Sequence, residues 1–248
     1  MNSNTEPIRI GLIGYGKMGK TVETVASRHG MEVAARFMDV VPFRSDASVR
    51  KALKGVSLMI DFSVPDAVLD HISLCAEFGL NLVMGTTGWA AQVDRARDLV
   101  QKGGIGFLHA ANFSLGVNLF YSVVRRAAEC FRPFESYDPY IEELHHKFKK
   151  DAPSGTAKVL HSILEELYGT RTVPVTNVRA GYIPGTHAVT FDSQIDSVSL
   201  VHTARNREGF AEGALLAARW LIGRQGFFEF QDMLDSVVSG TKNSRDTG

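Results

Sequence analysis

The amino-acid sequence predicts an α/β protein with a doubly wound parallel sheet and a second α+β domain. Three observations support this prediction. A short apolar run is followed at once by a glycine-rich turn and a helix-like segment, within residues 8–28. The same alternation of strand-like and helix-like segments repeats as far as residue 109. After residue 174 it gives way to segments with the two-residue period of strands.

Composition limits the kind of protein this can be. Of the 248 residues, 44% are hydrophobic and 22% are charged, as in a folded chain with room for one large domain or two modest ones. The 27 lysines and arginines balance the 27 aspartates and glutamates, so we expect no polybasic surface for nucleic acid. No apolar run reaches the roughly 18 residues of a membrane helix, and residues 1–7 lack a signal-like apolar core. We therefore expect a cytoplasmic enzyme without a membrane partner. Cys75 and Cys130 form no CxxC pair and are expected to be buried, reduced thiols.

The first half of the chain predicts alternating strands and helices. Residues 8–13 are apolar and rich in β-branched side chains, as in a buried strand, and residues 17–28 follow as a helix. The later elements are expected as strands at 31–38, 56–62, 80–84 and 105–109 and as helices at 66–77 and 90–102. Strand–helix units of this length predict a parallel sheet with helices on both faces.

From about residue 118 the pattern becomes mixed. In order, we expect a helix at 119–130, a segment at 140–150, a loop at 151–155, a helix to 166, antiparallel strands at 175–180, 186–193 and 197–203, a helix at 209–221 and a short final element at 227–234. The change of pattern predicts two domains, one formed by residues 1–115 plus 207–248 and the other by residues 116–206.

A glycine-rich turn follows the first predicted strand. Gly14, Gly16 and Gly19 match the pattern GxGxxG where a helix begins. Glycine suits this turn because its backbone can turn sharply and because no Cβ blocks a pyrophosphate at the helix N-terminus. The pattern alone also fits an ordinary glycine-rich turn. Asp39 adds support, since it ends the next predicted strand where an acid commonly binds the adenosine ribose, although it could be a plain turn residue. Together these residues predict a Rossmann-type dinucleotide-binding domain.

The cofactor preference rests on the residue after Asp39. Val40 stands there rather than an arginine, so no obvious cation waits for the 2′-phosphate of NADPH. We therefore expect NADH to be favoured over NADPH, with Lys17, Arg36 and Arg44 as the cations that could reverse the preference.

A second group of chemically active side chains lies at residues 142–157. His145 can donate a proton near neutral pH, and His146 and Lys149 can hold anionic oxygens. Adjacent histidines could also ligate a metal, but they lack the i, i+4 spacing that places two ligands on one helical face. We therefore expect no metal site.

Ser154, Gly155 and Thr156 precede a helical run in the same region. Their hydroxyls and backbone N–H groups could receive a substrate carboxylate at the helix N-terminus. Ordinary N-capping would explain the same residues. Lys147 and Lys150 are expected to be solvated surface charges.

The run from Glu143 to Ala157, with the pattern HHxxKxDxPSGT, resembles the signature of the 4-hydroxy-tetrahydrodipicolinate reductase family, also called dihydrodipicolinate reductases. The likeness spans nearly the whole chain, at Asp61–Pro65, Gly85–Gly88, Ala110–Asn118, Arg179–Gly181, His187, Arg207 and Phe210. The first turn departs from the family pattern. It reads GYGKMG in place of GxxGRMG, one residue shorter, so the resemblance does not carry over a preference for NADH or NADPH.

The resemblance implies a role for each matching residue. His145 would be the proton donor and acceptor of the chemical step, and Lys149 a second donor or a charge stabiliser. The substrate carboxylates would be held by His146, Ser154, Gly155 and Thr156. The implied cofactor-binding residues are Gly14, Tyr15, Gly16, Lys17 and Met18 at the pyrophosphate, Asp39 at the ribose, Gly85, Thr86, Thr87, Ala110, Ala111, Asn112 and Phe113 at the nicotinamide end, and Phe62, Arg207 and Phe210.

The resemblance also implies a reaction. Hydride would pass from a reduced nicotinamide to C4 of a cyclic, unsaturated dicarboxylate, giving tetrahydrodipicolinate in the diaminopimelate branch of lysine biosynthesis. The family likeness further implies a homotetramer joined through the sheet of the second domain. Two alternatives stay open: another two-domain amino-acid or imino-acid dehydrogenase, acting on diaminopimelate or aspartate, and a cofactor-binding regulator without turnover.

Overall fold

A computed structural model describes residues 6–38 and 47–243, and it divides the chain into two compact units. Unit 1 is formed by Met1–Ser114 and Phe210–Gly248, and unit 2 by Leu115–Gly209. Among the helices of the described ranges, none has the length and apolar character needed to cross a membrane.

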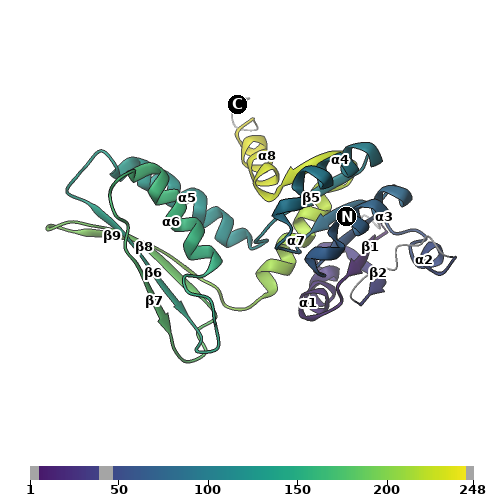
Figure 1. Ribbon diagram of the computed structural model, residues 1–248, viewed down its shortest axis with the longest axis horizontal. Helices are drawn as coiled ribbons and strands as arrows, with labels where there is room; N and C mark the ends of the chain where they lie inside the picture. Colours follow the sequence, from purple (N-terminus) through teal and green to yellow (C-terminus); the bar gives the residue numbers. More distant parts are fainter. Residues whose placement is uncertain (1–5, 39–46, 244–248) are drawn as a thin grey trace, which may run out of the picture. The chain divides into compact units, whose positions relative to one another are not determined.

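Unit 1 is built on a sheet of six parallel strands in the order β10-β5-β4-β3-β1-β2 (Figure 1). The strands are β1 (Ile8–Ile13), β2 (Met31–Phe37), β3 (Leu58–Asp61), β4 (Asn81–Met84), β5 (Gly106–His109) and β10 (Gly226–Glu229). The helices are α1 (Lys17–Ala26), α2 (Ala47–Ala52), α3 (Val68–Phe78), α4 (Val93–Gly103), α7 (Glu208–Leu221) and α8 (Phe230–Asn243), with short 3-10 turns η1 (Ser27–His29), η2 (Pro65–Ala67) and η3 (Ala90–Gln92). The predicted Rossmann-type parallel sheet is confirmed.

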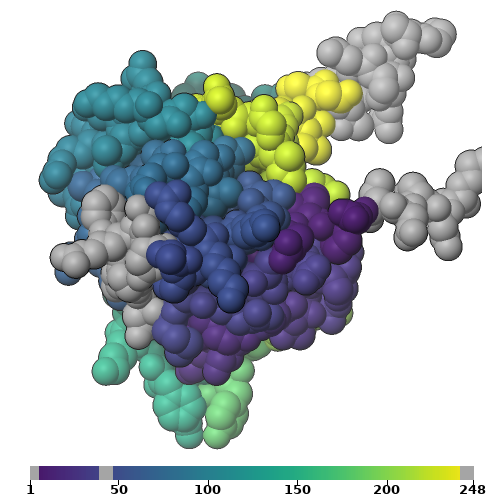
Figure 2. All heavy atoms as spheres, turned by 90° about the vertical axis from the view of Figure 1, so that its right-hand side faces the viewer, coloured from purple at the N-terminus to yellow at the C-terminus, as the bar shows by residue number. Residues whose placement is uncertain are grey.

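The central strands of unit 1 are covered on both faces, which is why the sequence shows continuous apolar runs there. All four residues of β3 are buried. On one face, Ile72 of α3 and Val100 of α4 share a core with Leu82 of β4. From β1 to β2 the chain moves toward one edge of the sheet, and from β3 to β5 it moves toward the opposite edge. Because crossovers between parallel strands are right-handed, α1 covers the face opposite the one that carries α3 and α4. α7 returns the chain to the N-terminal segments of this unit (purple in Figure 2), where its Arg219 donates to the backbone oxygen of His29.

Two parts of unit 1 differ from the predicted pattern. α2 is not predicted because only Val49 among its six residues is buried, which leaves no apolar period to recognise. The short final element expected at 227–234 proves to be the edge strand β10 followed by the first residues of the longer helix α8.

Unit 2 is a four-stranded sheet in the order β7-β6-β8-β9, with two helices packed against one face. The strands are β6 (Asp138–His145), β7 (Val175–Arg179), β8 (Thr186–Asp192) and β9 (Ser197–Thr203), and the helices are α5 (Leu115–Phe131) and α6 (Gly155–Tyr168). Ile141 and Val189 of the sheet meet Val124 of α5 and Leu160 of α6 in the core. The predicted second α+β domain is confirmed.

Two predictions for unit 2 are wrong. β7 was expected to be antiparallel, but it runs parallel to β6, while β8 and β9 are antiparallel as expected. The reason is that α6 lies between β6 and β7 in the chain, and a helical crossover returns the next strand in the same direction. Cys130 was expected to be buried but is exposed near the end of α5, whereas Cys75 is buried.

Candidate active site

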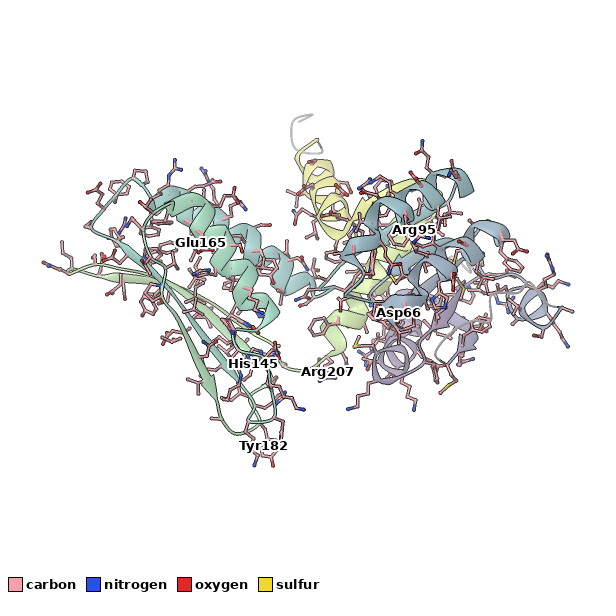
Figure 3. The ribbon with its side chains drawn as sticks, viewed as in Figure 1. Asp66, Arg95, His145, Glu165, Tyr182 and Arg207 are labelled. Atoms are coloured by element: carbon pink, nitrogen blue, oxygen red, sulfur yellow. The ribbon has the colours of Figure 1, made fainter. Side chains whose placement is uncertain are left out.

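The strands of unit 2 gather four polar side chains at one end of the sheet. Glu143 and His145 lie two residues apart on β6, so both point to the face that carries α6, and both are buried. Arg179 of β7 stands opposite His145, and His187 of β8 stands opposite Glu143. Figure 3 shows His145 at this end of the sheet, beside the start of α6.

The N-terminus of α6 joins this cluster through Ser154. The Ser154 hydroxyl accepts a hydrogen bond from the Ala157 N–H at 3.2 Å, so the N-capping expected as one alternative is present. The same oxygen lies 3.0 Å from Nε2 of His187, and the Ser154 N–H donates to Glu143 Oε2 at 2.7 Å. The cap therefore fixes the start of α6 against the strands.

Both nearby cations are paired with acids. Arg179 donates to Glu143 Oε1 and, at 2.6 Å, to the backbone oxygen of Asp151. Lys149 Nζ donates to Asp151 Oδ1 at 2.8 Å. The charges of the cluster are thus balanced, so Lys149 would have to exchange or share its contact with Asp151 to bind an anionic ligand.

Burial and neighbouring charges shift the pKa values of the cluster. Burial lowers the pKa of His145, Glu143 raises it, and two nearby cations lower it further, so that the net shift is downward. Burial, together with the nearby His145, lowers the pKa of His187 to about 4. Burial opposes ionisation of Glu143, but hydrogen bonds from Ser154 and Arg179 bring its pKa below the usual value. Near neutral pH the cluster therefore holds an ionised glutamate beside largely neutral histidines.

The substrate-side residues proposed from the sequence lie together in the segment between β6 and the first turn of α6. His146 is half-buried, and its Nδ1 is a buried atom without a hydrogen-bond partner among the described residues. Gly155 is exposed, and an added Cβ there would meet nothing within 4 Å. Thr156 is half-buried in the same turn. The space in front of the first α6 turn is therefore open to a ligand.

Four residues of this cluster received no role from the sequence alone. Glu143 carried a signal, since a charged residue on the buried face of a strand is unusual. Arg179 and His187 reach the cluster through strand pairing, which no local pattern reveals. Gly185 has a φ of +147°, and a Cβ there would lie 2.9 Å from His145 Nε2, so glycine keeps space beside the imidazole.

The cluster includes one set of possible metal ligands. Single atoms of Glu143, His145 and His187 lie within 4.8 Å of one another. Glu143 already accepts hydrogen bonds from His145, Ser154 and the cationic Arg179, which leaves little room for a second cation. The expectation that this region binds no metal stays a prediction.

In unit 1 the glycine turn connects β1 to α1. Gly14 has a φ of +78°, and a Cβ there would come within 2.4 Å of the Phe62 backbone oxygen. Gly16 is the N-cap of α1, and a Cβ added to it would meet nothing within 4 Å. Gly14 is therefore needed by the fold itself, whereas the space beside Gly16 fits the close approach of a pyrophosphate to the helix N-terminus.

The other residues of this turn show how its charges are arranged. Lys17 is exposed at the start of α1, and Met18 is half-buried. The Tyr15 hydroxyl donates to Glu23, which also pairs with Arg36, so the positive charge of Arg36 is already balanced. Asp39, Val40 and Arg44, on which the ribose and 2′-phosphate predictions rest, lie outside the described residues.

Three predicted cofactor residues lie close together after β3, β4 and β5. A Cβ on Gly85 would overlap the Phe62 ring, so that ring lies directly against the glycine, and Phe62 packs edge-on against Phe113 with ring centroids 6.1 Å apart. Buried Asp61 at the end of β3 accepts from Thr86 Oγ1 at 3.2 Å and lies 2.6 Å from His71 Nδ1. The turn after β4 is thus tied to the end of β3.

The remaining cofactor candidates are more open. They are exposed Thr87 and Ala111, half-buried Ala110 and Asn112 after β5, exposed Arg207 before α7, and half-buried Phe210 in α7. The turns after β1, β3, β4 and β5 all lie at the carboxyl edge of the sheet, where nucleotides bind in such folds.

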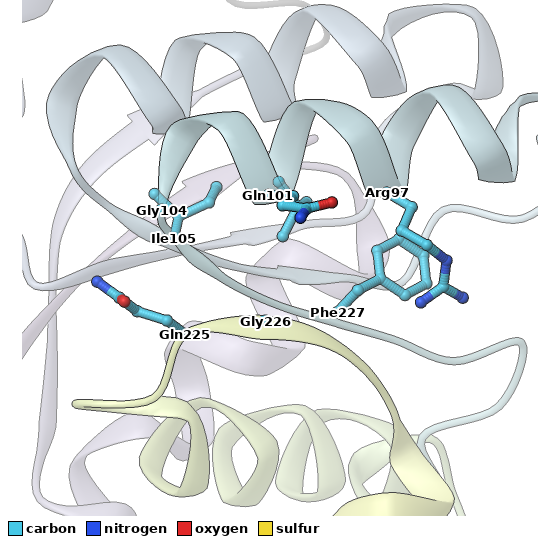
Figure 4. A pocket seen from close by; sticks show the side chains of 8 residues that line it. Arg97, Gln101, Gly104, Ile105, Gln225, Gly226 and Phe227 are labelled. Carbon is cyan, nitrogen blue, oxygen red and sulfur yellow. The ribbon is translucent and has the colours of Figure 1, made fainter.

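A different cavity of unit 1, of about 400 Å³, lies away from this edge (Figure 4). Ile105 and Gly226 line it where β5 and β10 begin, and Arg97 of α4 lies over the Phe227 ring at 4.3 Å. Because it lies at the amino edge of the parallel sheet, this cavity is not the candidate dinucleotide site.

Family models match both halves of the chain. Residues 8–113 match the model described as dihydrodipicolinate reductase, N-terminus, and residues 116–234 match the model described as dihydrodipicolinate reductase, C-terminus. Among solved structures, the dipicolinate-bound dihydrodipicolinate reductase from Paenisporosarcina sp. TG-14 superposes with a TM-score of 0.76 at 22% identity, over 91% of this chain and 99% of that chain. At this level of identity the superposition supports the fold.

Full-length relatives carry the same family name. A 4-hydroxy-tetrahydrodipicolinate reductase from Christiangramia forsetii is 36% identical over 93% of this chain and 99% of its own length. One from Methanospirillum hungatei is 31% identical over 92% of this chain and 99% of its own length. These matches confirm the resemblance seen in the sequence and imply a nicotinamide nucleotide cofactor. The chain belongs to the 4-hydroxy-tetrahydrodipicolinate reductase (dihydrodipicolinate reductase) family of nicotinamide-dependent oxidoreductases.

Proposed function

We propose that this protein reduces 4-hydroxy-tetrahydrodipicolinate to tetrahydrodipicolinate, with NADH as the favoured cofactor, in the diaminopimelate route to lysine. The observation that carries the proposal is the buried cluster of Glu143, His145 and Arg179 beside the open first turn of α6. It supplies a proton carrier, a fixed cation and helix N–H groups within one unit.

The substrate in this proposal is a ring with two carboxylates. A related enzyme is described as bound to dipicolinate, which is such a ring. The N–H groups at the start of α6, at Gly155 and Thr156, would receive one carboxylate, since a helix N-terminus favours anions. His146 and Lys149 would bind the other, with Ser154 holding the helix start in place.

The chemistry requires charge stabilisation on the ring. When bound, the reduced nicotinamide supplies the hydride. Loss of the 4-hydroxyl group as water gives a conjugated imine. Hydride addition to C4 of this imine then leaves electron density on the ring, which the ammonium of Lys149 would stabilise as it develops. Protonated His145 would then deliver a proton to the ring from Nε2, because Nδ1 is engaged with Glu143 at 3.2 Å.

The cofactor would lie on unit 1. Gly14, Gly16, Lys17 and Met18 would hold the pyrophosphate at the start of α1, and Asp39 the ribose. The Phe62, Gly85 and Phe113 group, together with the turns at 85–87 and 110–113, would face the nicotinamide. The pairing of Arg36 with Glu23 supports NADH, since it keeps one nearby cation from a 2′-phosphate.

The decisive experiment is a reductase assay with both cofactors. Substrate is generated in place from pyruvate and aspartate semialdehyde, and oxidation of NADH or NADPH is followed by absorbance. We expect turnover with both cofactors and a larger kcat/KM with NADH. A kcat/KM for NADPH ten times that for NADH would refute the preference. Oxidation of diaminopimelate or aspartate with NAD⁺, or the absence of any turnover, would instead support one of the alternative functions.

We also propose that the protein is a homotetramer joined through the sheet of unit 2. The sheet face opposite α5 and α6 carries many small serine and threonine residues, together with apolar side chains such as Val178, which is 45% exposed, and Val201, which is 59% exposed. Exposed apolar side chains among small residues on an open sheet face support its use as an interface.

The proposed tetramer interface can be tested by introducing one charged side chain into this sheet face. Val201→Glu would place a carboxylate in the middle of this sheet face and is expected to shift the mass measured by light scattering from four chains toward smaller species. Val123→Glu is the matched control, because Val123 is similarly exposed, at 53%, but lies on α5. A tetramer that survives Val201→Glu unchanged would argue against this sheet face as the interface.

A further inference from the structure

The carboxylate of Glu143 is the centre of the unit 2 cluster. Its side chain has no exposed surface. It receives hydrogen bonds from three directions: from His145 Nδ1 at 3.2 Å, from the Ser154 N–H at 2.7 Å, and from the Arg179 guanidinium. These donors belong to β6, the start of α6 and the end of β7. A carboxylate offers about four lone-pair positions, so most of its capacity is used.

The contact with His145 determines which nitrogen carries the proton. An ionised carboxylate only accepts hydrogen bonds, so neutral His145 must donate through Nδ1–H. The lone pair of the neutral ring then lies on Nε2. Gly185 leaves space beside this atom, since a Cβ there would come within 2.9 Å of it. Nε2 is therefore the atom that can exchange a proton with a substrate.

Glu143 also affects the protonation of His145 through its charge. The groups that act on the imidazole are Glu143 on the same strand, Lys149 in the following loop, Arg179 on β7 and His187 on β8. Of these described groups, Glu143 is the only acid. It opposes the effects of burial and of both cations, all of which disfavour a protonated imidazole.

We propose that Glu143 is a positioning residue for the reductase reaction, which holds His145 in the Nδ1–H tautomer and stabilises its protonated form while it orders the start of α6. This inference rests on the proposed function, because it assigns His145 a proton-transfer role. Glu143 itself would not touch the substrate, since its carboxylate is enclosed by its three donors.

The kinetic test is Glu143→Gln, which preserves the shape of the side chain and removes its charge. We expect kcat to fall at least about tenfold, as when the acid behind a catalytic histidine is replaced, while KM for NADH changes little. Loss of the negative charge lowers the His145 pKa further, so the fall in activity with rising pH should move to lower pH. The matched control is Glu165→Gln, which removes a charge from an exposed carboxylate 3.1 Å from His161 Nδ1 and should leave both kcat and the pH profile unchanged.

A second measurement depends neither on Glu143→Gln nor on turnover. The ¹⁵N shifts of His145 in the wild-type protein, assigned by comparison with a His145→Gln variant, should report the Nδ1–H form. The Nε2–H form in the wild type would overturn the proposal, even if Glu143→Gln fails to fold. A folded Glu143→Gln protein with wild-type kcat and pH profile would overturn it as well. Failure of the proposed function would instead appear as a wild-type protein without reductase turnover, whatever the tautomer.

Discussion

Replacement of His145 by alanine is expected to lower kcat by at least about a hundredfold, within the usual range for loss of a general acid or base. The neighbouring His187 is poorly suited to take over the proton transfer. The Nε2 atom of His187 faces the Ser154 hydroxyl at 3.0 Å, and the pKa of His187 is lowered to about 4. At pH 7 that ring is therefore almost entirely neutral.

The pH profile gives this prediction a second readout. If the protonated form of His145 is required, wild-type activity falls as pH rises through its pKa, which burial lowers in the unliganded protein. A bound dicarboxylate should raise this pKa, so the fall in kcat should occur at higher pH than the fall in kcat/KM. The same limb should be absent from the residual activity of His145→Ala.

The control for this experiment is His161→Ala. His161 lies in the same unit on α6, where its ring contacts the Val173 backbone oxygen at 3.1 Å and the Glu165 carboxylate. Loss of these contacts should affect stability more than turnover. If His145→Ala retained near-normal turnover, His145 would have no part in the mechanism.

The sequence predicted most of unit 1 because its information there is local. The apolar run of β1 indicates a buried strand, and the glycines after it indicate a tight turn before a helix. The repeated alternation of strand-like and helix-like segments predicts a parallel sheet with helices on both faces. α2 has only one buried residue, so its sequence shows no apolar periodicity from which a helix could be predicted.

In unit 2 the sequence predicted the existence of strands better than their directions. The two-residue period of residues 175–179 indicates a strand but is the same for parallel and antiparallel pairing. His145 and Ser154 belong to one continuous segment, so the sequence could place them in one candidate site. Arg179 and His187 reach the cluster only through strand pairing, which the sequence does not reveal.

For Ser154 and the residues after it, the sequence left two interpretations open, N-capping of the helix and binding of a carboxylate, and the two are compatible. Its hydroxyl caps α6, as the simpler interpretation required, and the same residue also touches Glu143 and His187. Capping satisfies only part of the first turn of a helix. The remaining N–H groups, beside the open position at Gly155, are available to the carboxylate proposed for this site.

The glycine turn of unit 1 leads to the second prediction with a large effect. Gly16→Ala is expected to raise the Kd for NADH at least about tenfold, a cost of about 1.4 kcal/mol or more, while changing the melting temperature little. The added methyl group meets nothing within 4 Å in the protein, so the fold should tolerate it. It would occupy the space into which we propose that the pyrophosphate fits.

Two further variants separate loss of binding from loss of folding. Gly14→Ala should lower both the melting temperature and the NADH affinity, because Gly14 has a φ of +78° and its Cβ would lie 2.4 Å from the Phe62 backbone oxygen. Gly240→Ala adds a methyl group in open space on α8 and should leave NADH affinity unchanged. Calorimetric titration with NADH and thermal melts of all three proteins would distinguish these cases. Wild-type NADH affinity in Gly16→Ala would mean that the pyrophosphate does not approach α1 at this glycine, and the proposed cofactor site would have to be abandoned.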